Sequence, residues 1–292
     1  MNINHFVKLH GLGNDYVVFD SEKLDIKLTS EAIKRICDVH YGIGSDGILL
    51  KIPSTNADFG LRIFNPDGSE AEKSGNGLRI FCKYLFDYKF SNDKTFTIET
   101  LGGIVTGNID KELNGKTSVV SIDMGTAIFN SKDIPVNIPK SECMDETLEV
   151  SGKIFNINCV SVGNPHCVII KDKLIKDEVL KYGPMIETHP IFPNRINVQF
   201  ARVISPAEVE ILIWERGAGY TLASGSSASA VACITHKKGL TSNEVVIRMP
   251  GGNLKIYINN DWSIILTGEV RQIAEGIISN EFIEDIKKGM KH

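Results

Sequence analysis

An internal repeat constrains the fold of this 292-residue chain more than any other feature of its sequence. Four pairs of short segments recur in the same order at a shift of 150 or 149 positions. They are Gly13-Asn14 with Gly163-Asn164, residues 61–65 with 211–215, Ser74-Gly75 with Ser224-Gly225, and Gly102-Gly103 with Gly251-Gly252. A single match is expected by chance, but four in one order indicate duplication of a structural unit.

Each half has the same expected plan, in which extended segments outnumber helices. Val, Ile and Phe-rich runs predict strands at 16–19, 95–99, 119–123, 167–170 and 245–248. Apolar residues at three-to-four spacing predict helices over 30–41, 74–88 and 224–238. The pattern predicts an α+β fold of two pseudo-symmetric domains, each a curled, mostly antiparallel sheet around a central helix, with an active site in the cleft between them. We expect one domain to comprise residues 1–119 plus 270–292, and the other 120–269.

Composition excludes several classes of function. A net charge of −4 without a stripe of Lys or Arg argues against nucleic acid as a partner. The sequence contains no apolar run long enough for a membrane span, and its first residues lack the apolar core of a signal peptide, so we expect a cytoplasmic protein. The six cysteines form neither a CxxC pair nor a zinc spacing, which predicts free thiols and no metal. Cys82, Cys167 and Cys233 are expected in the core.

Residues 42–47 satisfy the dinucleotide-binding pattern G-x-G-x-x-G, but in the wrong structural context. The fingerprint requires a strand before the glycines and a helix after them. Here a predicted helix comes first and the strand-like residues 48–52 follow, so nucleotide binding is not expected.

The two Ser-Gly pairs stand where each central helix is predicted to begin. A helix N-terminus carries unpaired N–H groups and the positive end of the helix dipole, and glycine there lets an anion approach. Serine is also a preferred N-cap residue, which is a purely structural interpretation of Ser74 and Ser224. The repetition of the arrangement, with Asn65 or Glu215 nine residues upstream, favours a functional site in which both helices bind one carboxylate.

Six motifs together resemble those of the diaminopimelate epimerase family. They are Gly11-Leu-Gly-Asn-Asp15, Asn65-Pro-Asp-Gly-Ser-Glu70, Ser74-Gly-Asn-Gly77, Gly163-Asn-Pro-His166, Asn197-Val198 and Glu215-Arg-Gly-Ala-Gly219. They occur in family order and span most of the chain. The resemblance implies an isomerase that needs neither metal nor pyridoxal phosphate, inverts the α-carbon of an amino acid by proton transfer at its two faces, and forms a homodimer. The implied reaction interconverts L,L- and meso-diaminopimelate, on the route to lysine and cell-wall precursors.

The resemblance also implies a role for each matching residue. Ser74 and Ser224 occupy the acid/base positions, and His166 and Glu215 assist proton transfer. The residues implied to bind the α-carboxylate are Gly75, Asn76, Gly225 and Ser226. Those implied to hold the rest of the substrate are Asn14, Asn65, Asn164, Asn197 and Arg216. An arginine fork suits a second, distal carboxylate.

The chain departs from the family pattern at the acid/base positions, where the family has cysteine and this sequence has Ser74 and Ser224. A hydroxyl is a far weaker acid than a thiol, so the exchange should lower the rate by orders of magnitude if nothing compensates. Tyr220 stands in place of a usual glutamate, and residues 225–228 read Gly-Ser-Ser-Ala in place of Gly-Thr-Gly-Ala. Three explanations stay open: an engineered inactive variant, an enzyme with altered proton transfer or another amino-acid substrate, and a non-catalytic amino-acid-binding relative.

Overall fold

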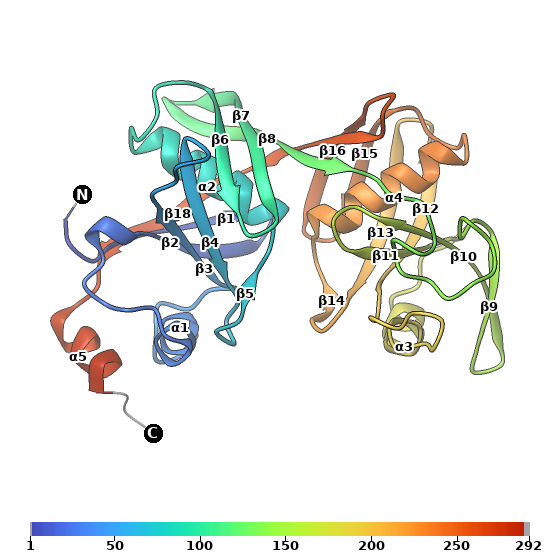
Figure 1. The fold of residues 1–292 in the computed structure, drawn as a ribbon, viewed down its shortest axis with the longest axis horizontal. Helices are drawn as coiled ribbons and strands as arrows, with labels where there is room; N and C mark the ends of the chain where they lie inside the picture. Colours follow the sequence, from blue (N-terminus) through green and yellow to red (C-terminus); the bar gives the residue numbers. More distant parts are fainter. Residues whose placement is uncertain (1, 289–292) are drawn as a thin grey trace. The chain divides into compact units, whose positions relative to one another are not determined.

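The computed structural model describes residues 2–288, which divide into two compact units. Unit 1 is Met1–Ile122 with Gly268–His292, and unit 2 is Asp123–Thr267. Residues 289–292, at the end of the first expected domain, lie outside the described part of the chain. Figure 1 shows that each unit consists of strands wrapped around one long helix.

Unit 1 contains one long buried helix and a curled sheet. Its helices are η1 (Ser21–Lys23), α1 (Ser30–Cys37), α2 (Gly75–Asp87) and α5 (Asn280–Lys288). Its strands are β1 (His5–Gly11), β2 (Asn14–Asp20), β3 (Ile48–Ile52), β4 (Phe59–Phe64), β5 (Glu70–Ala71), β6 (Thr95–Thr100), β7 (Gly103–Leu113), most of β8 (Lys116–Thr126) and β18 (Arg271–Ile277). Most pairings are antiparallel, but β2 pairs with β3 and β4 with β6 in parallel.

Unit 2 repeats this plan. Its helices are α3 (Lys176–Glu187) and α4 (Gly225–Lys237). Its strands are β9 (Glu146–Val150), β10 (Lys153–Ser161), β11 (Pro165–Ile170), β12 (Asn197–Ser205), β13 (Glu208–Glu215), β14 (Gly219–Thr221), β15 (Glu244–Met249), β16 (Gly252–Ile258) and most of β17 (Ser263–Glu269). The two parallel pairs, β11 with β12 and β13 with β15, are again set among antiparallel ones.

The strand registers of the two units match residue by residue. Val17 pairs with Ile48 in unit 1, and Cys167 pairs with Val198 in unit 2, so both partners are shifted by 150 positions. After the central helix the shift becomes 149, as in the turns that join Thr100 to Gly103 and Met249 to Gly252. The predicted α+β class, the curled sheets and the duplication are therefore confirmed.

The central helices begin at the Ser-Gly pairs, as predicted. Ser74 and Ser224 are extended N-cap residues whose hydroxyls accept a hydrogen bond from the N–H three residues later. Helix α2 is buried along its whole length except for its last residue, and α4 contacts strands β10 to β13, β15 and β16. Such a helix is buried on nearly every side, so it needs strands around its whole circumference.

Local sequence signals gave one helix a wrong end and missed two other helices. The helix predicted over 30–41 ends at Cys37, because the Asp38 carboxylate accepts hydrogen bonds from the N–H groups of His40 and Tyr41 and turns the chain. Helix α3 was not predicted: its N-cap Ile175 makes no side-chain cap and Pro184 lies inside it. Helix α5 was not predicted either, although it is strongly amphipathic.

The cysteines and the glycine-rich segment 42–47 occur as expected. Cys82, Cys167 and Cys233 are fully buried, and all six cysteines are free. Segment 42–47 follows α1 and precedes β3, which is the reverse of a dinucleotide-binding turn.

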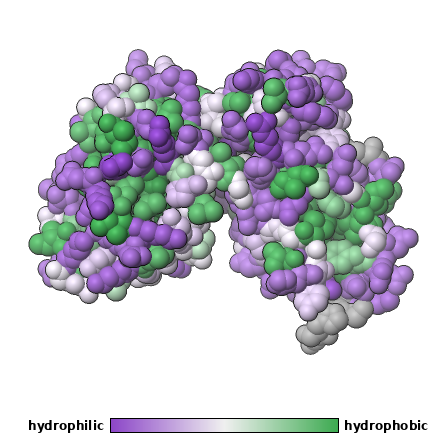
Figure 2. Space-filling view, turned by 180° about the vertical axis from the view of Figure 1, so that it is seen from behind, coloured by the Kyte–Doolittle hydropathy of each residue, from purple (hydrophilic) through white to green (hydrophobic). Residues whose placement is uncertain are grey.

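The face of each unit that Figure 2 shows carries both hydrophilic and apolar residues. Hydrophilic residues cover most of the face of each unit shown in Figure 2, with apolar residues in patches among them. Within residues 2–288, no helix is long and apolar enough to cross a membrane.

Gly183 in α3 allows the helix to pack directly against Trp214, the residue before Glu215. A Cβ atom at position 183 would lie 2.6 Å from Trp214 Cγ and 2.8 Å from its Cβ. We expect Gly183→Ala to lower the free energy of unfolding by about 1–3 kcal/mol through overpacking, measured by urea denaturation. Met185→Ala, at an exposed position of α3, is the control and should have little effect. Equal stability of both variants would contradict this account of the packing.

Candidate active site

Ser74 is the N-cap residue of α2. Its Oγ accepts a hydrogen bond from the Gly77 N–H at 3.1 Å and lies 3.3 Å from the Tyr16 hydroxyl. Tyr16 belongs to β2, which lies against α2. The hydroxyl of Ser74 is thus oriented by the helix N-terminus and by one phenol.

Asparagines connect the loop before β2 to the same helix start. Asn76 Nδ2 donates to Asn14 Oδ1 at 3.1 Å, and Asn14 Nδ2 donates to the Asp46 carboxylate at 2.9 Å. Asn76 is buried, whereas Asn14 is half-buried. The structure therefore brings Asn14, Gly75 and Asn76 together beside Ser74, as their predicted roles require. Asn65 makes no such contact in the hydrogen bonds described: its side chain donates to Ser69 Oγ at 2.9 Å, within the turn between β4 and β5.

Ser224 occupies the equivalent position at the start of α4 and is only 6% exposed. Its Oγ accepts from the Ser227 N–H at 3.4 Å and lies 3.4 Å from Ser226 Oγ. Two hydroxyls and the unpaired N–H groups of the first turn thus gather at one helix start.

Glu215, at the end of β13, is hydrogen-bonded to the Ser224 side chain. The hairpin of β13 with β14 pairs Glu215 with Gly219 and returns the chain to Ser224. Burial raises the pKa of Glu215, and the hydroxyls of Ser224 and Thr221 only partly offset this effect. A carboxyl group with a raised pKa, in contact with the Ser224 hydroxyl, is suited to exchanging protons.

His166 is fully buried on β11. Its Nε2 lies 2.8 Å from Asn164 Oδ1. Burial lowers the pKa of His166 to about 3; the Gln199 side chain opposes this change and the charge of Arg216 adds to it. The imidazole is therefore neutral at physiological pH and a weak base in this state, although its ring nitrogens can still donate and accept hydrogen bonds.

Asn197 fixes the loop that carries Arg216. Its Oδ1 accepts from the Arg216 N–H at 2.9 Å, and its Nδ2 donates to the Pro165 carbonyl at 2.9 Å. The guanidinium is exposed and donates to the Asn194 carbonyl at 3.0 Å. Unit 2 therefore groups Asn164, His166, Asn197, Glu215 and Arg216 around its Ser-Gly pair.

Three residues of these networks were missed by sequence reasoning. Tyr16 contacts Ser74 and is the repeat counterpart of His166. Gln199 is fully buried and donates to Ser227 Oγ at 3.0 Å. Arg79 is fully buried and contacts Gly75 and Asn76. The shift of 150 positions was the signal that could have found Tyr16, because it aligns this residue with His166.

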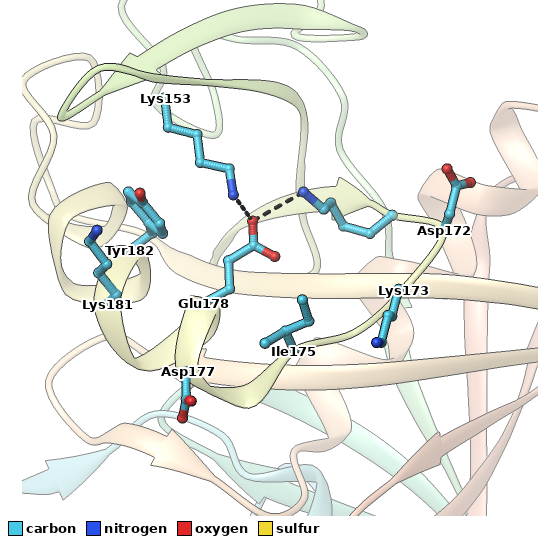
Figure 3. A pocket seen from close by; sticks show the side chains of 9 residues that line it. Lys153, Asp172, Lys173, Ile175, Asp177, Glu178, Lys181 and Tyr182 are labelled. Atoms are coloured by element: carbon cyan, nitrogen blue, oxygen red, sulfur yellow. Dashed lines mark hydrogen bonds and ion pairs between the residues drawn. The ribbon is translucent and has the colours of Figure 1, made fainter.

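The predicted site residues do not line the pocket of about 420 Å³ that lies beside the start of α3. Figure 3 shows Lys153 pointing toward the Glu178 carboxylate, which it approaches to 2.5 Å. Lys171 forms an ion pair with the same carboxylate at 3.1 Å. Burial raises the pKa of Glu178, but these two lysines outweigh that effect and the net change is downward. The pocket is thus built around an internal ion-pair network. Within residues 2–288, no group of three His, Cys, Asp or Glu side chains could hold a metal ion.

Solved structures first place the fold in a class. A probable proline racemase from Agrobacterium radiobacter superposes with a TM-score of 0.70 at 14% identity, covering 94% of this chain and 93% of that one. A hydroxyproline epimerase from Agrobacterium vitis gives a TM-score of 0.69 at 13% identity, covering 94% and 90%. The fold is that of these racemases and epimerases.

The sequence comparisons are more specific. The model of the family described as diaminopimelate epimerase matches residues 6–130 and 158–273. Diaminopimelate epimerase 2 of Nostoc sp. is 50% identical over 277 residues, covering 94% of this chain and 96% of the relative. The diaminopimelate epimerase of Carboxydothermus hydrogenoformans is 43% identical over 274 residues, covering 93% and 98%. The chain belongs to the diaminopimelate epimerase family, which is a family of isomerases.

Substitution of the two serines should separate capping from chemistry. Ser74→Ala and Ser224→Ala each remove the acceptor for a first-turn N–H, so we expect each to lower the free energy of unfolding by about 0.5–2 kcal/mol. Ser74→Asn and Ser224→Asn retain a capping oxygen and should be close to the parent in urea denaturation, although they remove the hydroxyl. Unchanged stability of the alanine variants would show that the caps contribute little.

Proposed function

We propose that this protein is a cofactor-independent amino-acid epimerase that interconverts L,L- and meso-diaminopimelate by proton transfer at both faces of the α-carbon. The observation that carries the proposal is the pair of serine-capped helix starts, at equivalent positions of a duplicated fold, in a member of the diaminopimelate epimerase family. We further propose two epimerase-like domains, residues 1–119 with 270–292 and residues 120–269, which correspond to the two units although the unit boundaries lie at Ile122/Asp123 and Thr267/Gly268.

The proposed roles follow from the contacts within each unit. Ser74 acts at one face of the α-carbon and Ser224 at the other, with His166 and Glu215 assisting proton transfer. Gly75, Asn76, Gly225 and Ser226 bind the α-carboxylate through their N–H groups and side chains. Asn14, Asn65, Asn164, Asn197 and Arg216 hold the amino group and the distal part of the substrate.

The Ser224 hydroxyl has a neighbour that can take part in proton transfer. Glu215 contacts it and has a raised pKa, so it can accept a proton that leaves substrate through Ser224 and return it later. Within residues 2–288, the hydrogen bonds described for the Ser74 hydroxyl are those with the Tyr16 hydroxyl and the Gly77 N–H, and the Ser74 and Tyr16 hydroxyls each carry a proton that can be donated.

The serine pair supports an alternative function. A binding protein needs Arg216 and the asparagines but no acid or base, and a hydroxyl is a poor base when it is not activated. A racemase of another amino acid would keep the α-carboxylate site and change the residues near Arg216. Both alternatives predict binding of an amino acid; only the racemase also exchanges the α-hydrogen.

We also propose that the protein acts in the cytoplasm as a homodimer, with a small-molecule substrate and no nucleic-acid partner. Six free, buried cysteines suit a reducing compartment. The homodimer follows from family resemblance and would be checked by light scattering.

Incubation with L,L-diaminopimelate in deuterated water should place deuterium at the α-carbon, detected by mass spectrometry and proton NMR. Because Glu215 must be ionised to act as a base and its pKa is raised, we expect the rate to rise with pH through a value above that of an ordinary glutamate. Glu215→Gln should lose this rise and most of the exchange. Binding without exchange, for diaminopimelate and other amino acids alike, would favour the binding protein.

Cysteine at both positions tests whether serine is a poor substitute. The double variant Ser74→Cys, Ser224→Cys should epimerise faster than the parent by about two orders of magnitude or more, since a thiolate at a helix N-terminus forms near neutral pH. Steady-state rates over a range of pH would measure the change. A double variant no faster than the parent would mean that the serines belong to a different mechanism.

A further inference from the structure

Helix α2 contains two buried cations that differ in their partners. Lys83 is 3% exposed and forms an ion pair with Asp87 at 2.7 Å, while it also donates to the Thr117 carbonyl at 2.7 Å. Arg79 is 0% exposed, and no carboxylate of residues 2–288 forms an ion pair with it. Buried charges in proteins are normally paired, so Arg79 is the exception that needs an explanation.

The hydrogen bonds of Arg79 go to uncharged groups. Nη1 donates to the Gly75 carbonyl at 3.2 Å and Nη2 donates to Asn76 Oδ1 at 2.8 Å, whereas Nε has no partner among the described residues. Burial lowers the pKa of Arg79 to about 10, so the guanidinium keeps its charge at physiological pH. The free protein therefore holds an uncompensated positive charge one turn into α2.

The position of this charge coincides with the proposed α-carboxylate site. Gly75 and Asn76, which accept its hydrogen bonds, are two of the residues proposed to bind that carboxylate. The repeat counterpart of Arg79 is Ser229, whose Oγ donates to the Gly225 carbonyl at 2.9 Å. The equivalent carbonyls of Gly75 and Gly225 thus accept a hydrogen bond from a cation in unit 1 and from a neutral hydroxyl in unit 2.

We propose that Arg79 is a positioning residue whose counter-ion is the carboxylate of the amino-acid substrate, bound at Ser74, Gly75 and Asn76. The inference rests on the proposed function for the location of the carboxylate. The buried charge adds to the positive end of the α2 dipole, and it orients Asn76 and, through it, Asn14. Substrate binding completes an ion pair that the folded protein leaves open.

The test compares Arg79→Met with Lys83→Met, two nearly isosteric removals of a buried cation from one helix. Thermal unfolding is followed with and without L,L-diaminopimelate, and with acetate as a simple carboxylate probe. Removing an unpaired buried charge relieves a desolvation cost, whereas removing Lys83 leaves Asp87 unpaired. For the free proteins, we expect the Tm of Arg79→Met to equal or exceed that of the parent, and the Tm of Lys83→Met to fall by roughly 5–15 °C.

The increase in Tm caused by the ligand should rank the two variants in the opposite order to their Tm values without ligand. The rise in Tm with L,L-diaminopimelate should be kept in Lys83→Met and lost in Arg79→Met, with partial recovery in Arg79→Lys. In turnover assays, Arg79→Met should raise KM at least tenfold with a smaller change in kcat.

Two outcomes would overturn the proposal. One is a Tm of free Arg79→Met as low as that of Lys83→Met, because Arg79 would then be an ordinary structural residue. The other is a ligand-induced rise in Tm of the same size in Arg79→Met and the parent. Failure of the proposed function looks different: the parent would be stabilised by the amino acid in an Arg79-dependent way but would exchange no α-hydrogen.

Discussion

Each unit depends on the burial of one helix on nearly all sides by its own sheet. A helix in that position cannot rely on bulk water for the N–H groups of its first turn, so these must be paired by side chains or by a ligand. Ser74 and Ser224 pair one such group each. The remaining groups and the positive end of the dipole mark the same two places as anion sites. In each unit, the serine that caps the helix is therefore also the residue proposed to take part in the chemistry.

The two units share one backbone plan but carry chemically different side chains at equivalent positions near the starts of their central helices. At equivalent positions, unit 1 has Tyr16, Asn65 and Arg79, and unit 2 has His166, Glu215 and Ser229. Position 77 is a glycine that packs near the Leu49 side chain, whereas Ser227 pairs with Gln199 through a hydrogen bond. Unit 1 thus supplies a buried cation and hydroxyls, while unit 2 supplies a carboxyl group and an imidazole.

With serine at both of the proposed acid/base positions, proton transfer requires help from neighbouring groups. A hydroxyl does not ionise near neutral pH even at a helix N-terminus, so a base must lie beside it. Glu215 meets this condition at Ser224, and burial keeps its pKa high enough for exchange. His166 stays neutral because it is buried and because the charge of Arg216 lies near it, and both lower its pKa. In the proposed mechanism, the Glu215 carboxyl group takes the part that the family resemblance implies for sulfur.

The sequence alone determined the duplication, the two central helices, the Gly102-Gly103 and Gly251-Gly252 turns and the buried cysteines. These follow from spacing and periodicity, which local backbone geometry turns directly into structure. Tertiary structure alone decided the contacts of Tyr16 with Ser74 and of Gln199 with Ser227, which join residues 58 and 28 positions apart. It also decided that Arg79 is fully buried without an ion pair to any carboxylate of residues 2–288, whereas the Lys83–Asp87 pair is an i,i+4 contact that helix spacing predicts. Whether a buried cation meets an acid from another element depends on which distant strands close around it, and no local pattern records that.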